Sequence, residues 1–166
     1  INFVPVRNLL LCVVGIALSA WMGVGRWAFG IGGELTLWYV PLIAIPFAIL
    51  QLAVVHRMRV AERRGRPIGR AVYLAKAVAW VCALGFGFTV PDVVDGQLVS
   101  IFSLLAGESQ LSMSIALCNP FGIIAFAGII AALIFSVVAG RDPRPSEDEL
   151  LDAAEELAMV EHPLSR

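Results

Sequence analysis

Apolar residues gather into four long runs, and short polar segments separate each run from the next. The runs extend over about residues 9–25, 35–55, 71–91 and 115–140. Because a helix of roughly 20 apolar residues crosses the hydrocarbon core of a bilayer, the pattern predicts four transmembrane helices. We therefore predict an all-α integral membrane protein in which residues 1–140 form a four-helix transmembrane domain.

The fourth run is uncharged from residue 111 to residue 140, which is longer than the hydrocarbon core requires. We expect its first residues to lie outside the core, or the helix to break at Asn119-Pro120, because proline cannot donate a backbone hydrogen bond. Two further prolines lie in the second run. The sequence thus predicts helix kinks at Pro41, Pro46 and Pro120.

A shorter apolar stretch covers residues 96–107 and cannot cross a bilayer. The polar residues Gln97, Ser100 and Ser103 recur every three positions in it, and apolar residues occupy the other face. This pattern predicts a short interfacial helix on the outer surface. The alternative interpretation is a lid or re-entrant element over an outer cavity.

The C-terminal tail, residues 141–166, is polar and predicts an amphipathic helix over about residues 147–160. Ser146 and Glu149 have the spacing of a capping box. One face of this helix is acidic, so anionic lipid head groups should repel it. We therefore expect Leu150, Leu151 and Leu157 to dock on a protein surface, either the chain's own basic loop or a partner.

Small residues recur at every fourth position in three of the four runs, which places each set on one helix face. Such faces allow close approach of helix backbones in membranes. Packing within the bundle is one interpretation, and self-association or a partner interface is the other. The predicted helix-packing residues are Gly15, Ser19, Gly23, Ala75, Ala79, Ala83, Gly87, Gly128, Ala132 and Ser136.

Basic residues concentrate between the second and third runs, and this asymmetry predicts the orientation. By the positive-inside rule this basic loop is cytoplasmic, and with four spans both termini lie on the same side. Arginine is abundant and Lys76 is the single lysine, which together with frequent Ala, Val and Gly indicates a bacterial plasma membrane protein. Because the chain begins at Ile1 without a methionine, we expect some N-terminal residues to be missing or processed. The basic loop contains Arg57, Arg59, Arg63, Arg64, Arg66 and Arg70.

Composition excludes several classes of protein. Of the 166 residues, 59% are apolar and 15% are charged, far from the balance of a soluble domain. The net charge of −1 provides no basic field for a nucleic acid. Cys12, Cys82 and Cys118 lie inside apolar runs without metal-ligand spacing, so we predict neither a metal nor a cofactor.

Ionisable residues are almost absent from the predicted spans, where they would mark function. Lys76 lies near the start of the third span, and we expect its side chain to snorkel to the cytoplasmic interface. Arg26 lies at the outer end of the first span, where Glu34 could pair with it. No catalytic residue is predicted.

The outer loop is acidic and leaves one further possibility open. Asp92, Asp95 and Glu108, together with Asn119, could form a cation site, or they could belong to a solvated loop.

The absence of buried charge, the small-residue faces and the tail together predict a non-catalytic accessory or interaction subunit of a larger membrane complex. Its expected partners are the lipid bilayer and other membrane protein chains, in a hetero-complex or a homo-oligomer, and not nucleic acid. The alternative is a small transport component with a substrate path near the kinked second and fourth spans.

Overall fold

The computed structural model describes residues 3–141, 151–155 and 157, and these residues are mostly helical. Four helices are long and apolar enough to cross a membrane, as the sequence predicts. The elements, in chain order, are α1 (Phe3–Val24), η1 (Gly25–Phe29), α2 (Thr36–Tyr39), η2 (Val40–Ala44), α3 (Ile45–Arg63), α4 (Arg70–Thr89), β1 (Asp92–Val94), β2 (Gln97–Val99), α5 (Ile101–Ala106), η3 (Glu108–Gln110) and α6 (Leu111–Ala139).

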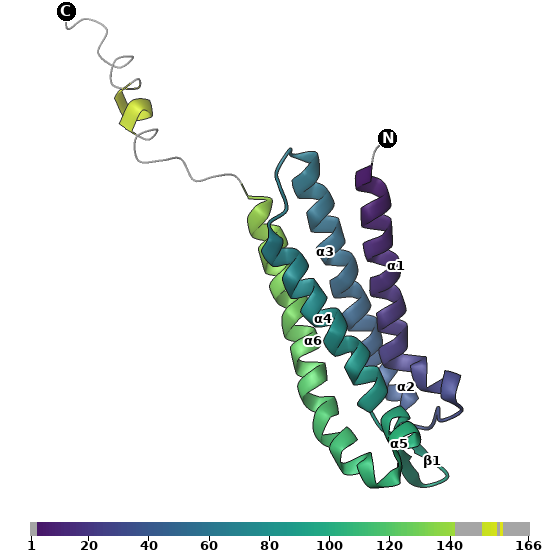
Figure 1. Ribbon diagram of the computed structural model, residues 1–166. Helices are drawn as coiled ribbons and strands as arrows, with labels where there is room; N and C mark the ends of the chain where they lie inside the picture. The colour runs from purple at the N-terminus through teal and green to yellow at the C-terminus, as the bar shows by residue number, and fades with distance from the viewer. Residues whose placement is uncertain (1–2, 142–150, 156, 158–166) are drawn as a thin grey trace, which may run out of the picture.

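The long helices α1, α3, α4 and α6 pack side by side (Figure 1). Helices α1 and α6 each pack against both α3 and α4, so α3 and α4 face each other across the bundle. One end of the bundle carries the start of α1 and the α3–α4 connection, and we call it the arginine-rich end. The other end carries β1, β2 and α5, and we call it the hairpin end.

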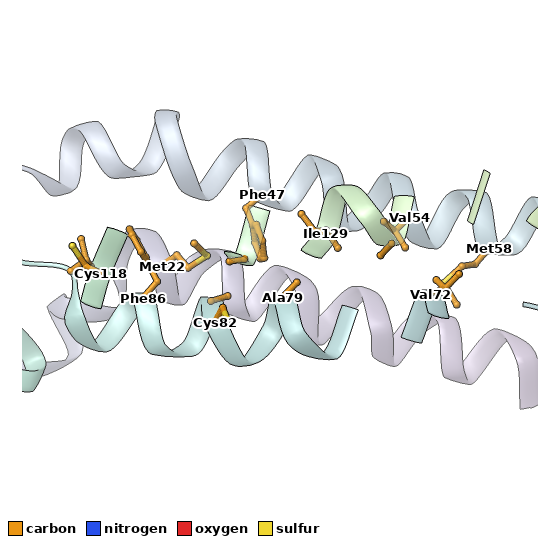
Figure 2. Packing of buried hydrophobic residues seen from close by; sticks show 14 residues of the cluster. Met22, Phe47, Val54, Met58, Val72, Ala79, Cys82, Phe86, Cys118 and Ile129 are labelled. Carbon is orange, nitrogen blue, oxygen red and sulfur yellow. The ribbon is translucent and has the colours of Figure 1, made fainter. Parts of the chain in front are cut away.

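The hydrophobic core runs along the middle of the bundle and draws residues from all four helices (Figure 2). Met22, Phe47, Ala79 and Ile129 are fully buried in it. Most other large apolar side chains on these helices are exposed, which suits helices whose outer faces contact lipid.

Two helix ends differ from the predicted boundaries at the arginine-rich end. Helix α3 continues to Arg63, so the first half of the predicted basic loop is helical and only residues 64–69 connect to α4. Residues 56–63 extend the second helix because Met58 and Ala61 remain buried against the bundle, while His56, Arg57, Arg59 and Arg63 are exposed and can be solvated. Helix α1 likewise begins at Phe3, well before the apolar run.

The prediction of an interfacial helix over residues 96–107 is wrong for the first residues of that range, which form strand β2. Strands β1 and β2 pair antiparallel, with Val94 opposite Gln97. Asp95 and Gly96 between them have φ angles of 51° and 77°, and an Asp-Gly pair favours a tight hairpin turn of this kind. The helix begins only at Ile101, after a capping box between Ser100 and Ser103.

The three prolines lie in helical segments that remain continuous in the chain. Pro41 lies in the π-helical turn η2, which joins α2 to α3, and Pro46 lies at the start of α3. Pro120 lies inside α6, which extends without a break from Leu111 to Ala139. The expected break at Asn119-Pro120 therefore does not occur, and α6 simply begins early.

Candidate functional site

A polar cluster lies inside the bundle, where Lys76 of α4 meets Gln51 of α3. The Lys76 ammonium donates a hydrogen bond to Gln51 Oε1 over 2.6 Å. Trp80, one turn further along α4, donates its indole N–H to the same oxygen over 3.2 Å. The ammonium also lies 5.0 Å from the centroid of the Trp80 ring, within the range of a cation–π interaction.

This cluster corrects the expectation that Lys76 snorkels to the interface. Lys76 is only 2% exposed and Gln51 is fully buried. As the seventh residue of a 20-residue helix, Lys76 lies about 5 Å from the midpoint of α4. Its side chain points inward because Val72, Ala79 and Ala83 share its helix face and are all buried.

The cluster has more hydrogen-bond donors than acceptors. Among the described residues, Lys76 forms no ion pair with a carboxylate. Within the part of the chain that the structure describes, the buried Nε2 of Gln51 has no hydrogen-bond partner. Gly15 of α1 closes the cluster, because a Cβ at that position would lie 3.0 Å from Gln51 Oε1. An ionisable group this deep in a membrane helix is by default a candidate functional residue.

A second buried cluster lies at the hairpin end and pairs Arg26 with Asp92 over 3.4 Å. Both side chains are almost fully buried. Arg26 also donates to the carbonyl of Gly23 over 2.9 Å and lies 4.5 Å from the centroid of the Tyr39 ring. The expected Arg26–Glu34 pair does not form, because the hairpin brings Asp92 against η1 and α2.

Asp92 is fixed by hydrogen bonds as well as by its partner arginine. Thr36 donates its hydroxyl to Oδ2 over 2.6 Å, and the backbone amides of Leu35 and Val93 donate to Oδ1 over 2.8 Å each. Burial alone would raise the pKa of the Asp92 carboxyl, but these hydrogen bonds hold its pKa below the ordinary value of 3.8. The cluster thus ties the hairpin to the start of the second span.

The possible outer cation site is not assembled. Asp92 is engaged with Arg26, and Asn119 lies exposed on α6. Within the described part of the chain, no three His, Cys, Asp or Glu side chains are grouped so that they could hold a metal ion.

At the arginine-rich end, an ion pair joins α1 to α3. Arg7 pairs with Glu62, and the buried Asn8 donates to the other oxygen of the same carboxylate over 2.9 Å. Arg64 donates to the carbonyl of Gly140 over 3.0 Å and so links the α3–α4 connection to the end of α6. The remaining predicted basic-loop residues lie at this end, exposed or half-buried: Arg57, Arg59, Arg63, Arg66 and Arg70.

The predicted helix-packing residues lie where helices of this chain meet. A Cβ at Gly128 of α6 would lie 3.1 Å from the carbonyl oxygen of Ala75 and 3.1 Å from Ala79 Cβ, both on α4. A Cβ at Gly23 of α1 would lie 2.8 Å from Ala44 Cβ. Four more of the set are buried within the bundle, and these are Ser19, Ala83, Ala132 and Ser136.

Two further glycines of these packing faces also contact other helices. Gly15 lies against Gln51, and a Cβ at Gly87 would collide with the Trp21 indole, which donates its N–H to the carbonyl of Leu84. These contacts all lie within the chain.

The described part of the tail does not dock on the chain's own basic loop. Residues 151–155 and 157 are helical, and Leu151 and Leu157 are 63% and 68% exposed. The predicted capping box and Leu150 lie outside the described residues. Leu151 and Leu157 therefore have no covering surface among the described residues.

Comparison of this chain with known protein families, with curated proteins and with solved structures finds no match.

Proposed function

We propose that this chain is a non-catalytic accessory or interaction subunit of a larger complex in a bacterial plasma membrane. The observation that carries the proposal is the exposure of Leu151 and Leu157 on an otherwise acidic helical segment. An isolated short helix is marginal in water, and its apolar side chains gain stability only when a second surface covers them.

The opposite charges of the arginine-rich end and the tail indicate that the tail binds a protein and not the lipid surface. Basic side chains at that end would attract anionic lipid head groups, whereas the acidic tail would be repelled by them. We therefore expect Leu151 and Leu157 to contact the soluble part of a partner protein and not the lipid surface. With both termini cytoplasmic, that partner surface is on the cytoplasmic side.

A co-purification experiment tests the proposal. The tagged chain is extracted in a mild detergent, and chains that co-purify are identified by mass spectrometry. We expect Leu151→Asp with Leu157→Asp to lose a specific set of chains that the wild type retains. The control, Leu151→Met with Leu157→Met, keeps the apolar stripe and should retain the set. Equal recovery with both double variants would contradict the proposal.

A transport component is the second candidate, and the buried Lys76–Gln51 cluster is the observation that favours it. Intramembrane ionisable groups form the proton relays and ion paths of many pumps and transporters. The π-helical turn η2 around Pro41 lies in the same span as Gln51. Such irregular turns in helices frequently occur at functional sites.

Proton flux into proteoliposomes with an entrapped pH-sensitive dye tests this second candidate. Lys76→Met should abolish a flux that depends on the cluster. The control Ala77→Met changes a neighbouring exposed position of α4 and should leave the flux intact. If wild type and Lys76→Met conduct equally, the transport candidate is excluded for protons.

A further inference from the structure

We propose that a pocket at the hairpin end binds a small amphiphile that carries a primary ammonium group. The pocket has a volume of about 760 Å³ and lies between the loop after η1, strand β2, helix α5 and the start of α6. This size is typical of small-molecule sites in proteins. The proposal is independent of the partner contacts of the tail.

The walls of the pocket are mainly apolar. Ile31, Leu104 and Leu111 supply apolar side chains from three different elements. Burial of an alkyl chain against such walls is favourable roughly in proportion to the apolar area removed from water. An apolar wall of this kind favours a ligand with an alkyl chain over a fully polar one.

The charge of the lining residues determines which head group the ligand should carry. Glu108 contributes the carboxylate among the lining residues, and it forms no ion pair within the described residues. The sequence contains no Lys, Arg or His between Lys76 and Arg141. Arg26, the basic residue at this end of the bundle, is buried against Asp92. The uncompensated charge is therefore negative, and it favours a cationic ligand.

The lining also distinguishes between kinds of cation. None of the described residues that line the pocket is aromatic, so these residues form no aromatic cage of the kind that recognises quaternary ammonium groups. The Glu108 carboxylate and the Gln97 side-chain carbonyl are hydrogen-bond acceptors, which match the N–H groups of a primary ammonium. A phosphate-bearing amphiphile would bring a second negative charge and find no basic partner.

Hydrogen bonds hold the elements around the pocket in place. The hydroxyls of Ser100 and Ser114 lie 2.7 Å apart, and Ser114 donates to the carbonyl of Thr89 over 2.7 Å. These hydrogen bonds connect the start of α5 to α6, and α6 to the end of α4. Ser103 of the lining is engaged with Ser100 in the capping box, so the pocket is preformed.

Photolabelling in nanodiscs of phosphatidylcholine tests the proposal. The probe is a diazirine derivative of octylamine, and labelled peptides are mapped by mass spectrometry. We expect labelling within residues 97–111, with competition by octylamine and not by octanol or octyl sulfate. Glu108→Gln should weaken binding of the probe about tenfold or more, because it removes a charge-assisted hydrogen bond.

Asp95→Asn is the matched control. It removes an equal charge at the same end but outside the pocket lining, and asparagine tolerates the positive φ of this turn. Asp95→Asn should therefore bind the probe as the wild type does. Equal weakening by both variants, or equal competition by octanol, would overturn the proposal. Loss of labelling in discs that contain phosphatidylethanolamine would assign the pocket to that lipid instead, and would also overturn it.

Discussion

The most extensive helix contact in the bundle, between α4 and α6, makes a sharp prediction about packing. Ala79 is fully buried, and a Cβ placed on Gly128 would lie only 3.1 Å from the Ala79 Cβ and 3.2 Å from its backbone nitrogen. The backbones of the two helices are therefore already as close as small residues permit. Ala79→Leu adds three carbon atoms at this contact and must push the helices apart.

The expected loss of stability follows from this geometry. Overpacking a well-packed core typically costs about 1–3 kcal/mol. A loss of that size changes the ratio of folded to unfolded protein about 5- to 150-fold. Gly128→Ala adds one carbon and requires the neighbouring atoms of α4 to shift by only a few tenths of an ångström, so its loss should be the smaller of the two.

Unfolding of the purified chain in a maltoside detergent, followed by fluorescence, measures these losses. Ala77→Leu is the control, because Ala77 lies on the exposed face of the same helix and an added leucine there meets lipid or detergent. The order of stability should be wild type and Ala77→Leu first, then Gly128→Ala, then Ala79→Leu. Equal stability of Ala79→Leu and Ala77→Leu would refute the close α4–α6 contact.

Three further predictions concern the polar contacts. Gln51→Leu should destabilise the fold by about 1–3 kcal/mol because it leaves the Lys76 ammonium without its acceptor, and a combined Lys76→Met substitution should recover that loss in the same unfolding assay. Asp92→Asn should cost about 3–5 kcal/mol, because it leaves a buried arginine unpaired; an unfolding midpoint equal to that of wild type would contradict this. Because the folded pKa of Asp92 is depressed below 3.8, its contribution is complete above that pH and should disappear as the pH falls further, as an acid titration of the midpoint can show. Glu62→Gln should free α1 at the arginine-rich end and raise amide exchange of residues 6–9, whereas unchanged exchange would mean that the ion pair with Arg7 adds no local stability.

The four spans could be predicted from the sequence because long apolar runs leave few alternatives once the bilayer thickness is fixed. The inward direction of Lys76 was also encoded, since it shares a helical face with Val72, Ala79 and Ala83. The expectation that lysine snorkels outweighed that signal. The structure shows that the polar acceptor Gln51 on the opposite helix permits the buried position.

The long-range pairings could not be predicted from the sequence. Glu34 is near Arg26 in the chain, yet Asp92 pairs with it across a separation of 66 residues, because the hairpin folds back onto η1. The Asp95-Gly96 turn was a local signal for that hairpin. The polar residues Gln97, Ser100 and Ser103, spaced every three positions, predict a helix over the whole segment that follows this turn. Only the residues from Ile101 onwards form that helix.

The proposed function depends on four helices that cross the bilayer with the arginine-rich end in the cytoplasm, and cysteine accessibility tests this most directly. In a chain without its native cysteines, single cysteines replace Arg63 and Gln97, which are both exposed and lie at opposite ends of the bundle. We predict that a membrane-impermeant thiol reagent labels Gln97→Cys in intact cells and labels Arg63→Cys only after the cells are opened. Labelling of Arg63→Cys in intact cells, or labelling of both positions from the same side, would contradict the account.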